Sequence, residues 1–556
     1  MRKYVPYSFV AIAVALILFS SVSFAQNNNG DSGKLPRPKL VVGIVVDQMR
    51  WDYLYRYYDR YGSDGFKRMI NQGFSADNTN IDYVPTVTAI GHTTIYTGSV
   101  PSIHGIAGND FIINATGETM YCTEDSTVST VGSTSNAGEM SPRNLLASTI
   151  TDELKLATNF RSKVIGVAIK DRGSILPAGH AADAAYWFDG ETGNFITSTY
   201  YMDKLPSWVD GFNKQKLVEK YLNQGWETLY PISSYIQSSA DDNRYEGKFS
   251  VSEKPVFPVN TAELYKKSGA GAIRTSPYGN TLSFDMAKAA VENEKLGQGV
   301  VTDFLALSLS STDYVGHQFG PNAIEVEDTY LRLDKELASF FKYLDEKVGA
   351  GEYTVFLSAD HGGAHNVSFL KDNNIPAGAW GSGKILTELN KVLQAKFGEE
   401  KLIISLLNYQ GHLNYKVIEE KGLDMEAIKL AAIDFLRKQE GVTYVVDMDK
   451  VQTASIPKVI RERIINGYNY DRSGNIQVIL DPAWYSSGSA NPTGTSHSAW
   501  NPYDAHIPLI FMGWGVNHGK TDRPTHMTDI AATIAAILKI QQPNGSIGIP
   551  ISEAIK

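Results

Sequence analysis

The sequence has little of three things, and each shortage excludes a class of protein. It has one cysteine, Cys122, in 556 residues, so a disulfide within the chain is impossible and no cysteine is placed to carry an N-terminal lipid anchor. It has no excess of positive charge, and the net charge of -9 argues against a nucleic-acid partner. After the N-terminus no stretch approaches about 20 uninterrupted apolar residues, so we expect no membrane anchor.

The N-terminus is typical of an export signal. Arg2 and Lys3 precede an apolar run at 9–19, and small residues around Ala25 supply a cleavage site. We therefore expect an exported protein, periplasmic or secreted. The remaining length, with 43% hydrophobic residues, suffices for one large catalytic domain. The predicted organisation is a signal peptide at 1–25, a polar tether at 26–37 and a catalytic domain at 38–556, with insertions at about 110–162 and 365–491.

Apolar, β-branched runs recur along the chain with helical patterns between them. The run 39–47 predicts a central strand, covered on both faces, that ends at Asp47. The pattern at 327–344 predicts an amphipathic helix. Strands that alternate with helices predict an α/β fold with a doubly wound, mostly parallel sheet and helices on both faces. The other predicted strands are 163–169, 304–309, 353–357 and 507–512.

Ionisable side chains follow four of these runs, where an α/β sheet collects its chemistry. A zinc site needs about three ligands drawn from histidine nitrogens and carboxylate oxygens. The sequence offers two Asp–His pairs, and a late histidine, His497, could complete the first. Each pair alone is a weak signal, but their joint position at strand ends favours a metal centre. The strand-end residues are Asp47, Lys170, Arg172, Asp313, His317, Asp360 and His361.

Thr88 is the candidate nucleophile. Pro85 supplies a rigid turn that leads into a predicted helix at 89–97. The positive end of a helix favours both an alkoxide and a bound phosphate. The alternative is that Thr88 only caps the helix, which the local sequence by itself favours.

The segments around these residues resemble the alkaline phosphatase superfamily, and are most similar to its phosphate-irrepressible (PafA-type) bacterial enzymes. The similarity extends from about Pro38 to the C-terminus and includes the stretches 45–53, 105–110 and 170–172. It implies two zinc ions per chain and a monomer. One ion would be held by Asp313, His317 and His497, and the other by Asp47, Asp360, His361 and the Thr88 oxygen. Asn109, Lys170 and Arg172 would contact the phosphate.

Charge matching favours phosphate monoesters as the small-molecule substrates. Two zinc ions, three aspartates and a threonine alkoxide sum to no net charge, whereas a monoester brings two negative charges. Lys170 and Arg172 supply two positive charges, and they would face the same way if extended geometry persists after the strand. The sequence therefore predicts an alkaline phosphatase that releases inorganic phosphate from varied monoesters through a phosphothreonine on Thr88.

Two alternatives remain open. A phosphodiesterase or nucleotide pyrophosphatase of the same superfamily would share the metals and Thr88 but prefer an apolar or nucleoside pocket. A zinc- or phosphate-binding protein without turnover would keep the scaffold only. A further histidine, His92, lies four residues after Thr88, and we expect it to be a buried hydrogen-bonding residue.

Overall fold

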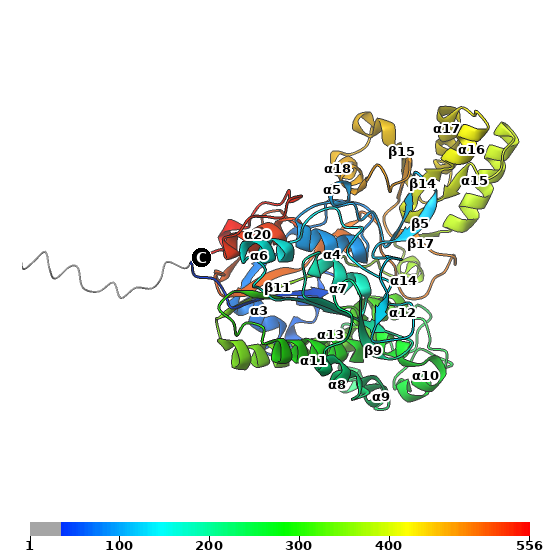
Figure 1. Cartoon of the computed structure of the whole chain (residues 1–556). Coiled ribbons are helices and arrows are strands. Elements are labelled where there is room, and N and C mark those ends of the chain that lie inside the picture. The colour runs from blue at the N-terminus through cyan, green and yellow to red at the C-terminus, as the bar shows by residue number, and fades with distance from the viewer. Residues whose placement is uncertain (1–34) are drawn as a thin grey trace, which may run out of the picture. The chain divides into compact units, whose positions relative to one another are not determined.

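A ten-stranded sheet organises residues 38–556 of the computed structural model, which describes residues 35–556 (Figure 1). The strand order is β20-β2-β19-β11-β1-β10-β7-β8-β9-β6. The central strands from β11 to β8 are all parallel, and β19 and β9 pair antiparallel on either side of them. These central strands are β11 (Tyr353–Ser358), β1 (Leu40–Val46), β10 (Asp303–Leu309), β7 (Val164–Ala168) and β8 (Ala184–Asp189).

The outer strands complete the sheet. On one side they are β19 (Leu509–Gly513), β2 (Phe74–Ala76) and β20 (Gly519–Thr521), and on the other β9 (Asn194–Ser198) and β6 (Thr130–Val131). The predicted doubly wound, mostly parallel sheet is therefore confirmed. The last predicted run, 507–512, corresponds to β19 and is antiparallel to its neighbours.

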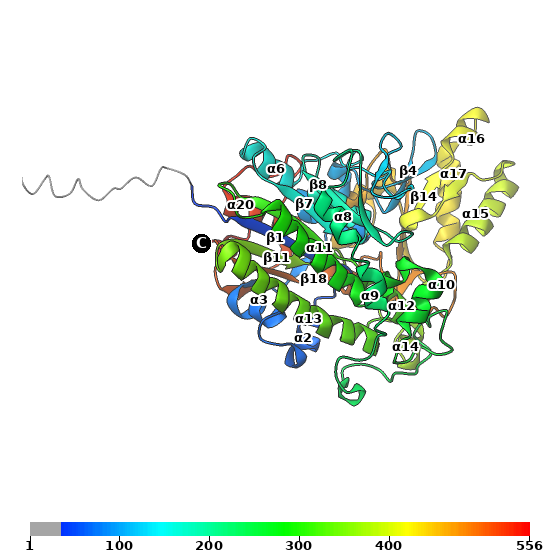
Figure 2. The ribbon, with the colours of Figure 1, turned by 60° about the horizontal axis from the view of Figure 1, so that its bottom comes forward.

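Helices cover both faces of the sheet (Figures 1 and 2). One face carries α4 (Thr88–Thr97), α6 (Ile150–Ala157), α7 (Asp171–Ala178) and α20 (Asp529–Leu538). The other carries α3 (Phe66–Gln72), α11 (Tyr278–Glu294) and α13 (Ile324–Leu344). The helix predicted at 327–344 is thus α13, which begins three residues earlier. Within the described residues, no helix is both long and apolar enough to cross a membrane.

The close approach of α4 to the sheet depends on a glycine in β1. Every residue of β1 is buried, as a strand covered on both faces must be. A Cβ on Gly43 would lie only 2.3 Å from the hydroxyl oxygen of Tyr96, a residue of α4. Glycine at this position therefore lets the Tyr96 side chain of α4 pack directly over β1.

A second, smaller sheet has a hydrophobic core of its own. Its strand order is β13-β14-β16-β15, with α15 (Ser382–Phe397) and α17 (Met425–Leu436) packed on it. Its strands are β13 (Ile403–Ser405), β14 (Gln410–Leu413), β15 (Val442–Asp447) and β16 (Ile476–Leu480). This second sheet falls within the predicted insertion 365–491. The predicted insertion 110–162 is different, because it contributes the strand β6 to the ten-stranded sheet and the helix α6 to one of its faces. The insertion bounds stay predictions.

The predicted signal peptide 1–25 lies outside the described residues, and so does most of the predicted tether 26–37. Both therefore stay predictions as well.

Candidate metal centre and active site

Three parallel strands deliver carboxylates and histidines to one edge of the sheet. Asp47 follows β1 directly, and Asp360 and His361 follow β11. Helix α12 (Ser311–Phe319) begins two residues after β10 ends, and its spacing of four residues puts Asp313 and His317 on one face. Because β1 lies between β10 and β11 with all three parallel, these ends meet at one place.

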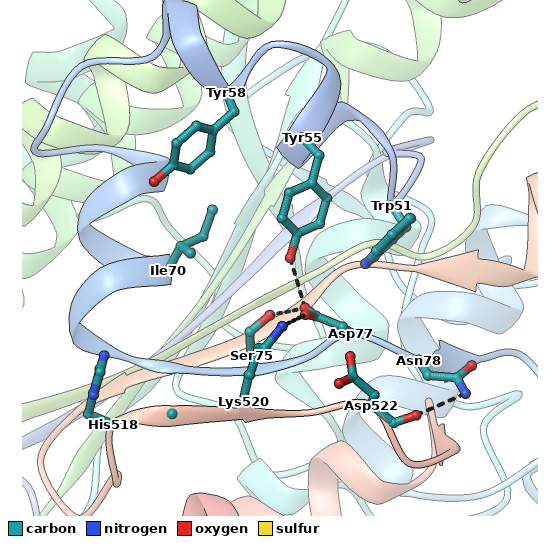
Figure 3. Close-up of a pocket in the computed structure, with 11 residues that line it drawn as sticks. Trp51, Tyr55, Tyr58, Ile70, Ser75, Asp77, Asn78, His518, Lys520 and Asp522 are labelled. Carbon is teal, nitrogen blue, oxygen red and sulfur yellow. Dashed lines mark hydrogen bonds and ion pairs between the residues drawn. The ribbon is translucent and has the colours of Figure 1, made fainter.

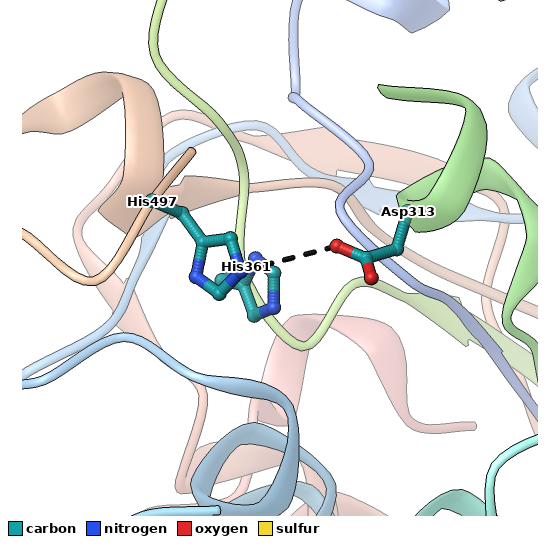
Figure 4. Close-up of side chains that lie close together, drawn as sticks. All are labelled: Asp313, His361 and His497. Atoms are coloured by element: carbon teal, nitrogen blue, oxygen red, sulfur yellow. Dashed lines mark ion pairs between the residues drawn. The ribbon is translucent and has the colours of Figure 1, made fainter. Parts of the chain in front are cut away.

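The side chains form two overlapping groups whose possible ligand atoms lie within 4.8 Å of one another. The first group contains Asp313, His361 and His497 (Figure 4), and the second contains Asp47, Asp360 and His361. His497 comes from the long segment between β17 (Trp484–Ser486) and α19 (Pro502–Ala505). The structure thus brings residues more than 400 positions apart into one buried cluster.

His317 belongs to the same cluster but lies at its solvent side. Its Nε2 is 3.1 Å from Asp313 Oδ1, and His497 Nε2 is 3.9 Å from the same oxygen. The His317 side chain is 38% exposed, whereas Asp47 and Asp360 are fully buried. A substrate would therefore reach the cluster from the side of His317.

Backbone carbonyls orient all three imidazoles. His317 Nδ1 lies 2.9 Å from the Thr495 oxygen, His361 Nδ1 2.8 Å from the Gly362 oxygen, and His497 Nδ1 2.7 Å from the Thr86 oxygen. A carbonyl can only accept, so each Nδ1 carries the proton and each Nε2 keeps its lone pair. Metal-ligating histidines are commonly held in this way.

Several buried polar atoms of the cluster have no hydrogen-bond partner. They are Asp47 Oδ1, Asp360 Oδ2 and His361 Nε2. Burial, together with the charge of Asp360, raises the pKa of Asp47 well above its usual range. Unpaired carboxylate oxygens beside a free imidazole nitrogen are costly in a protein interior unless a cation joins them. The residues therefore fit a divalent metal that accepts both oxygen and nitrogen ligands.

Thr88 is the first residue of α4 and is 1% exposed. The residue before the helix is Val87, whose apolar side chain cannot cap the helix. Among the described residues, the Thr88 side chain does not cap it either. The N–H of Ala89 instead donates to Asn109 Oδ1 at 2.9 Å. Asn109 therefore takes the capping role, and the Thr88 hydroxyl is left to face the cluster.

Lys170 lies between the two groups of carboxylates and next to Thr88. Its Nζ is 2.7 Å from Asp47 Oδ2, 2.7 Å from Asp313 Oδ2 and 3.3 Å from Thr88 Oγ1. Burial alone would lower the pKa of Lys170, but the charges of Asp313 and Asp47 raise it above its usual value. The lysine is therefore a permanent positive charge beside the candidate nucleophile.

Arg172 is not placed as the sequence suggested. Extended geometry does not continue past Lys170, because α7 begins at Asp171 and puts Arg172 in its first turn. Its Nη1 donates to the hydroxyl of Tyr121 at 2.9 Å, and that hydroxyl donates to Asp171 Oδ1. The buried Nε of Arg172 has no partner among the described residues. Arg172 thus keeps a free donor, which a bound anion would satisfy.

The type I phosphodiesterase / nucleotide pyrophosphatase family model matches residues 41–504. The chain belongs to this family. It is 52% identical over 543 residues to alkaline phosphatase PafA of Elizabethkingia meningoseptica, with 98% of each chain covered. It is 62% identical over 527 residues to a Myroides odoratus protein named calcium-transporting ATPase, covering 94% of this chain and 96% of that one. The crystal structure of PafA matches with a TM-score of 0.92 at 53% identity, covering 94% of this chain and all of the other. The predicted resemblance is confirmed.

Two residues that contact the site were not predicted, Gln48 and Tyr121. Gln48 donates from its backbone N–H to Asp360 Oδ1 at 3.0 Å and from Nε2 to Asp313 Oδ1 at 2.7 Å, so one residue ties the two groups together. Tyr121 holds Arg172, as described above. No local pattern marks either residue, although Gln48 directly follows Asp47. His92 forms hydrogen bonds through both ring nitrogens, to the backbone oxygen of Thr88 and to Ser308 Oγ. It is therefore the buried hydrogen-bonding residue that the sequence predicted.

A hollow of about 810 Å³ lies beside the β2–β20 edge of the main sheet (Figure 3). Aromatic rings of Trp51, Tyr55 and Tyr58 line one side of it, opposite Asp77 and Lys520. None of the candidate site residues lines this hollow, so it is separate from the candidate metal centre.

Proposed function

We propose that this chain is an exported alkaline phosphatase that hydrolyses phosphate monoesters with Thr88 as nucleophile and two zinc ions as cofactors. The observation that carries the proposal is the placement of Thr88 and Lys170, 3.3 Å apart, against two groups of buried metal-type ligands. The name of the PafA relative supports the same activity.

The two ions would take the ligands that the family resemblance implies. Asp313, His317 and His497 would hold one, and Asp47, Asp360, His361 and the Thr88 oxygen would hold the other. When bound, the ions would lower the pKa of the Thr88 hydroxyl and of an incoming water and stabilise the departing oxygen. His361 lies in both groups of the structure, which supports two closely spaced positions.

The chain's own residues would carry the phosphoryl group. Thr88 Oγ1, its proton released to solvent, attacks phosphorus and the bond from phosphorus to the ester oxygen breaks. The departing oxygen takes up a proton from water and leaves as an alcohol, with a phosphothreonine remaining on the enzyme. Water then attacks the same phosphorus from the vacated side, which releases inorganic phosphate and restores Thr88. Lys170, Arg172 and the amide of Asn109 would hold the phosphoryl oxygens, and the N-terminus of α4 adds a favourable dipole.

A monoester is favoured over a diester by the charges beside Thr88. A monoester dianion carries one more negative charge than a diester, and Lys170 with Arg172 supplies matching cations. The family model's description also names phosphodiesterases, so diester hydrolysis is the second candidate.

A substrate panel on zinc-saturated protein tests the proposal. p-Nitrophenyl phosphate should be hydrolysed faster than bis-p-nitrophenyl phosphate. ATP belongs in the panel because the Myroides relative is named a calcium-transporting ATPase. Faster hydrolysis of the diester would contradict the monoesterase assignment.

The nucleophile has its own test. Thr88→Ala should abolish turnover while the zinc content stays unchanged, because six ligands from side chains other than Thr88 remain. Turnover equal to wild type would remove Thr88 from its role.

Two further proposals rest on the sequence alone. The basic and apolar N-terminus supports export with cleavage after Ala25. The resemblance supports a monomer, which size-exclusion chromatography with light scattering would check.

A further inference from the structure

Two buried glutamates outside the metal centre have carboxylate oxygens without any donor. Glu325 is fully buried, and neither of its oxygens has a hydrogen-bond partner. Glu246 is 6% exposed, and its Oε2 has none, while its Oε1 accepts from the Asn243 amide at 2.5 Å. Within residues 35–556 no lysine, arginine or histidine forms an ion pair with either carboxylate. Three buried acceptor atoms therefore lack a positive partner.

The loop that carries Glu246 runs along the stretch that leads into α13, which carries Glu325, because the Gly247 N–H donates to the Gln318 oxygen. Burial and then the charge of Glu246 raise the pKa of Glu325 well above its usual range. Burial raises the pKa of Glu246 to about 8. Glu246 also lines a cavity of about 10 Å³ together with residues 319–323, and Glu325 lies two residues further on, in the first turn of α13. A cavity of this size holds about one water molecule or one small ion.

The atoms of these two residues that lack a partner are all carboxylate oxygens. Carboxylate oxygens select hard cations, and calcium tolerates irregular coordination and binds a carboxylate through both oxygens. We propose that Glu246 and Glu325 bind a calcium ion at a third site, distinct from the two ligand groups of the catalytic centre. The ion would neutralise two buried carboxylates that otherwise repel each other.

The proposed calcium site would brace the segments that present two catalytic-centre histidines. The loop containing Glu246 is bonded on one side to the stretch after His317, since the Ser239 N–H donates to the Asn322 oxygen and the Gly247 N–H to the Gln318 oxygen, both at 2.7 Å. On the other side the Gly494 N–H donates to the Tyr245 oxygen at 2.6 Å.

Those contacts continue into the centre itself. Gly494 precedes Thr495, whose oxygen bonds His317 Nδ1, and His497 is two residues further on. Calcium bound at the Glu246–Glu325 pair should therefore stabilise both the fold and the retention of zinc at the His317 side. This inference does not depend on the proposed monoesterase activity, because its first readout is calcium binding.

Calorimetric titration with calcium chloride, on full-length mature protein at saturating zinc and pH 8, tests it. We expect one calcium per chain, a higher melting temperature in calcium than in magnesium, and slower zinc release to a chelator. Glu325→Gln and Glu246→Gln should each weaken calcium binding at least tenfold. Glu263→Gln, on the exposed face of α10 (Thr261–Ser268), is the matched control and should bind calcium as wild type does.

The wild-type titration decides the matter even if a variant fails to fold. No calcium binding at millimolar concentration in the zinc-loaded wild type would overturn the proposal and indicate that the two glutamates share a proton instead. Calcium binding of unchanged affinity in a folded Glu246→Gln or Glu325→Gln variant would also overturn it, because the ion would then lie elsewhere.

Discussion

Replacing Lys170 by alanine tests the charge argument at its most buried point. The ammonium group contacts Asp47, Asp313 and Thr88, and Lys170 is only 4% exposed, so little water can substitute for it. Removing one preorganised donor from an active site typically costs about 3 kcal/mol, or about 10²–10³ in kcat. For a monoester dianion we expect a loss of kcat/KM of that size. For a diester, which has one charge fewer, we expect a loss of about tenfold or less.

The assay compares kcat/KM for p-nitrophenyl phosphate and its bis ester in the variant and the wild type. Zinc content must be measured in both, because Lys170 also contacts two proposed metal ligands. Lys155→Ala is a matched control, since Lys155 is equally buried and ion-paired with Asp183 in another part of the fold. Equal losses on the two substrates at full zinc occupancy would refute the charge-matching argument.

Two further predictions concern single side chains. Tyr121→Phe removes the hydroxyl that accepts a hydrogen bond from Arg172. The value of kcat/KM for monoesters should fall about five- to tenfold, which corresponds to the loss of about one hydrogen bond. Unchanged kinetics would show that other contacts hold Arg172 in place. Burial raises the pKa of Asp504 to about 8, whereas the unfolded chain titrates near 3.8. Between these values the folded state retains a proton that the unfolded state has lost, so the free energy of unfolding should fall as pH rises, by at most roughly 1.4 kcal/mol per pH unit. Asp504→Asn should flatten this dependence in urea unfolding, and an equal slope in the variant would contradict the assignment.

The meeting of the strand-end carboxylates could be predicted, because a buried apolar run allows few arrangements in the fold. A stretch such as 40–46, apolar on both faces, is typical of a central strand and is fully buried as one here. Since β1, β10 and β11 are parallel, the residues after them must meet, and Asp47, Asp313 and Asp360 do so.

The arrangement around Arg172 could not be predicted, because tertiary packing overrides local preference there. Gly173 and Pro177 argue against a helix at 171–178, yet α7 forms. A Cβ on Gly173 would lie 2.9 Å from Ser308 Oγ, so glycine allows the helix to pack close to β10. The helix then turns Arg172 toward Tyr121, which no pattern in the sequence indicates.

The contacts of Gln48 could not be predicted for a different reason. Its two carboxylate partners are 265 and 312 residues away in the chain, and its φ of 60° is one that non-glycine residues seldom adopt. Contacts of such long range leave no local periodicity or spacing from which to infer them.

Zinc titration of verified metal-free protein tests the central claim most directly, namely that paired divalent cations make Thr88 reactive. We expect no monoesterase activity before zinc is added and full recovery at two equivalents per chain. Full activity in a preparation shown to contain no metal would contradict the account.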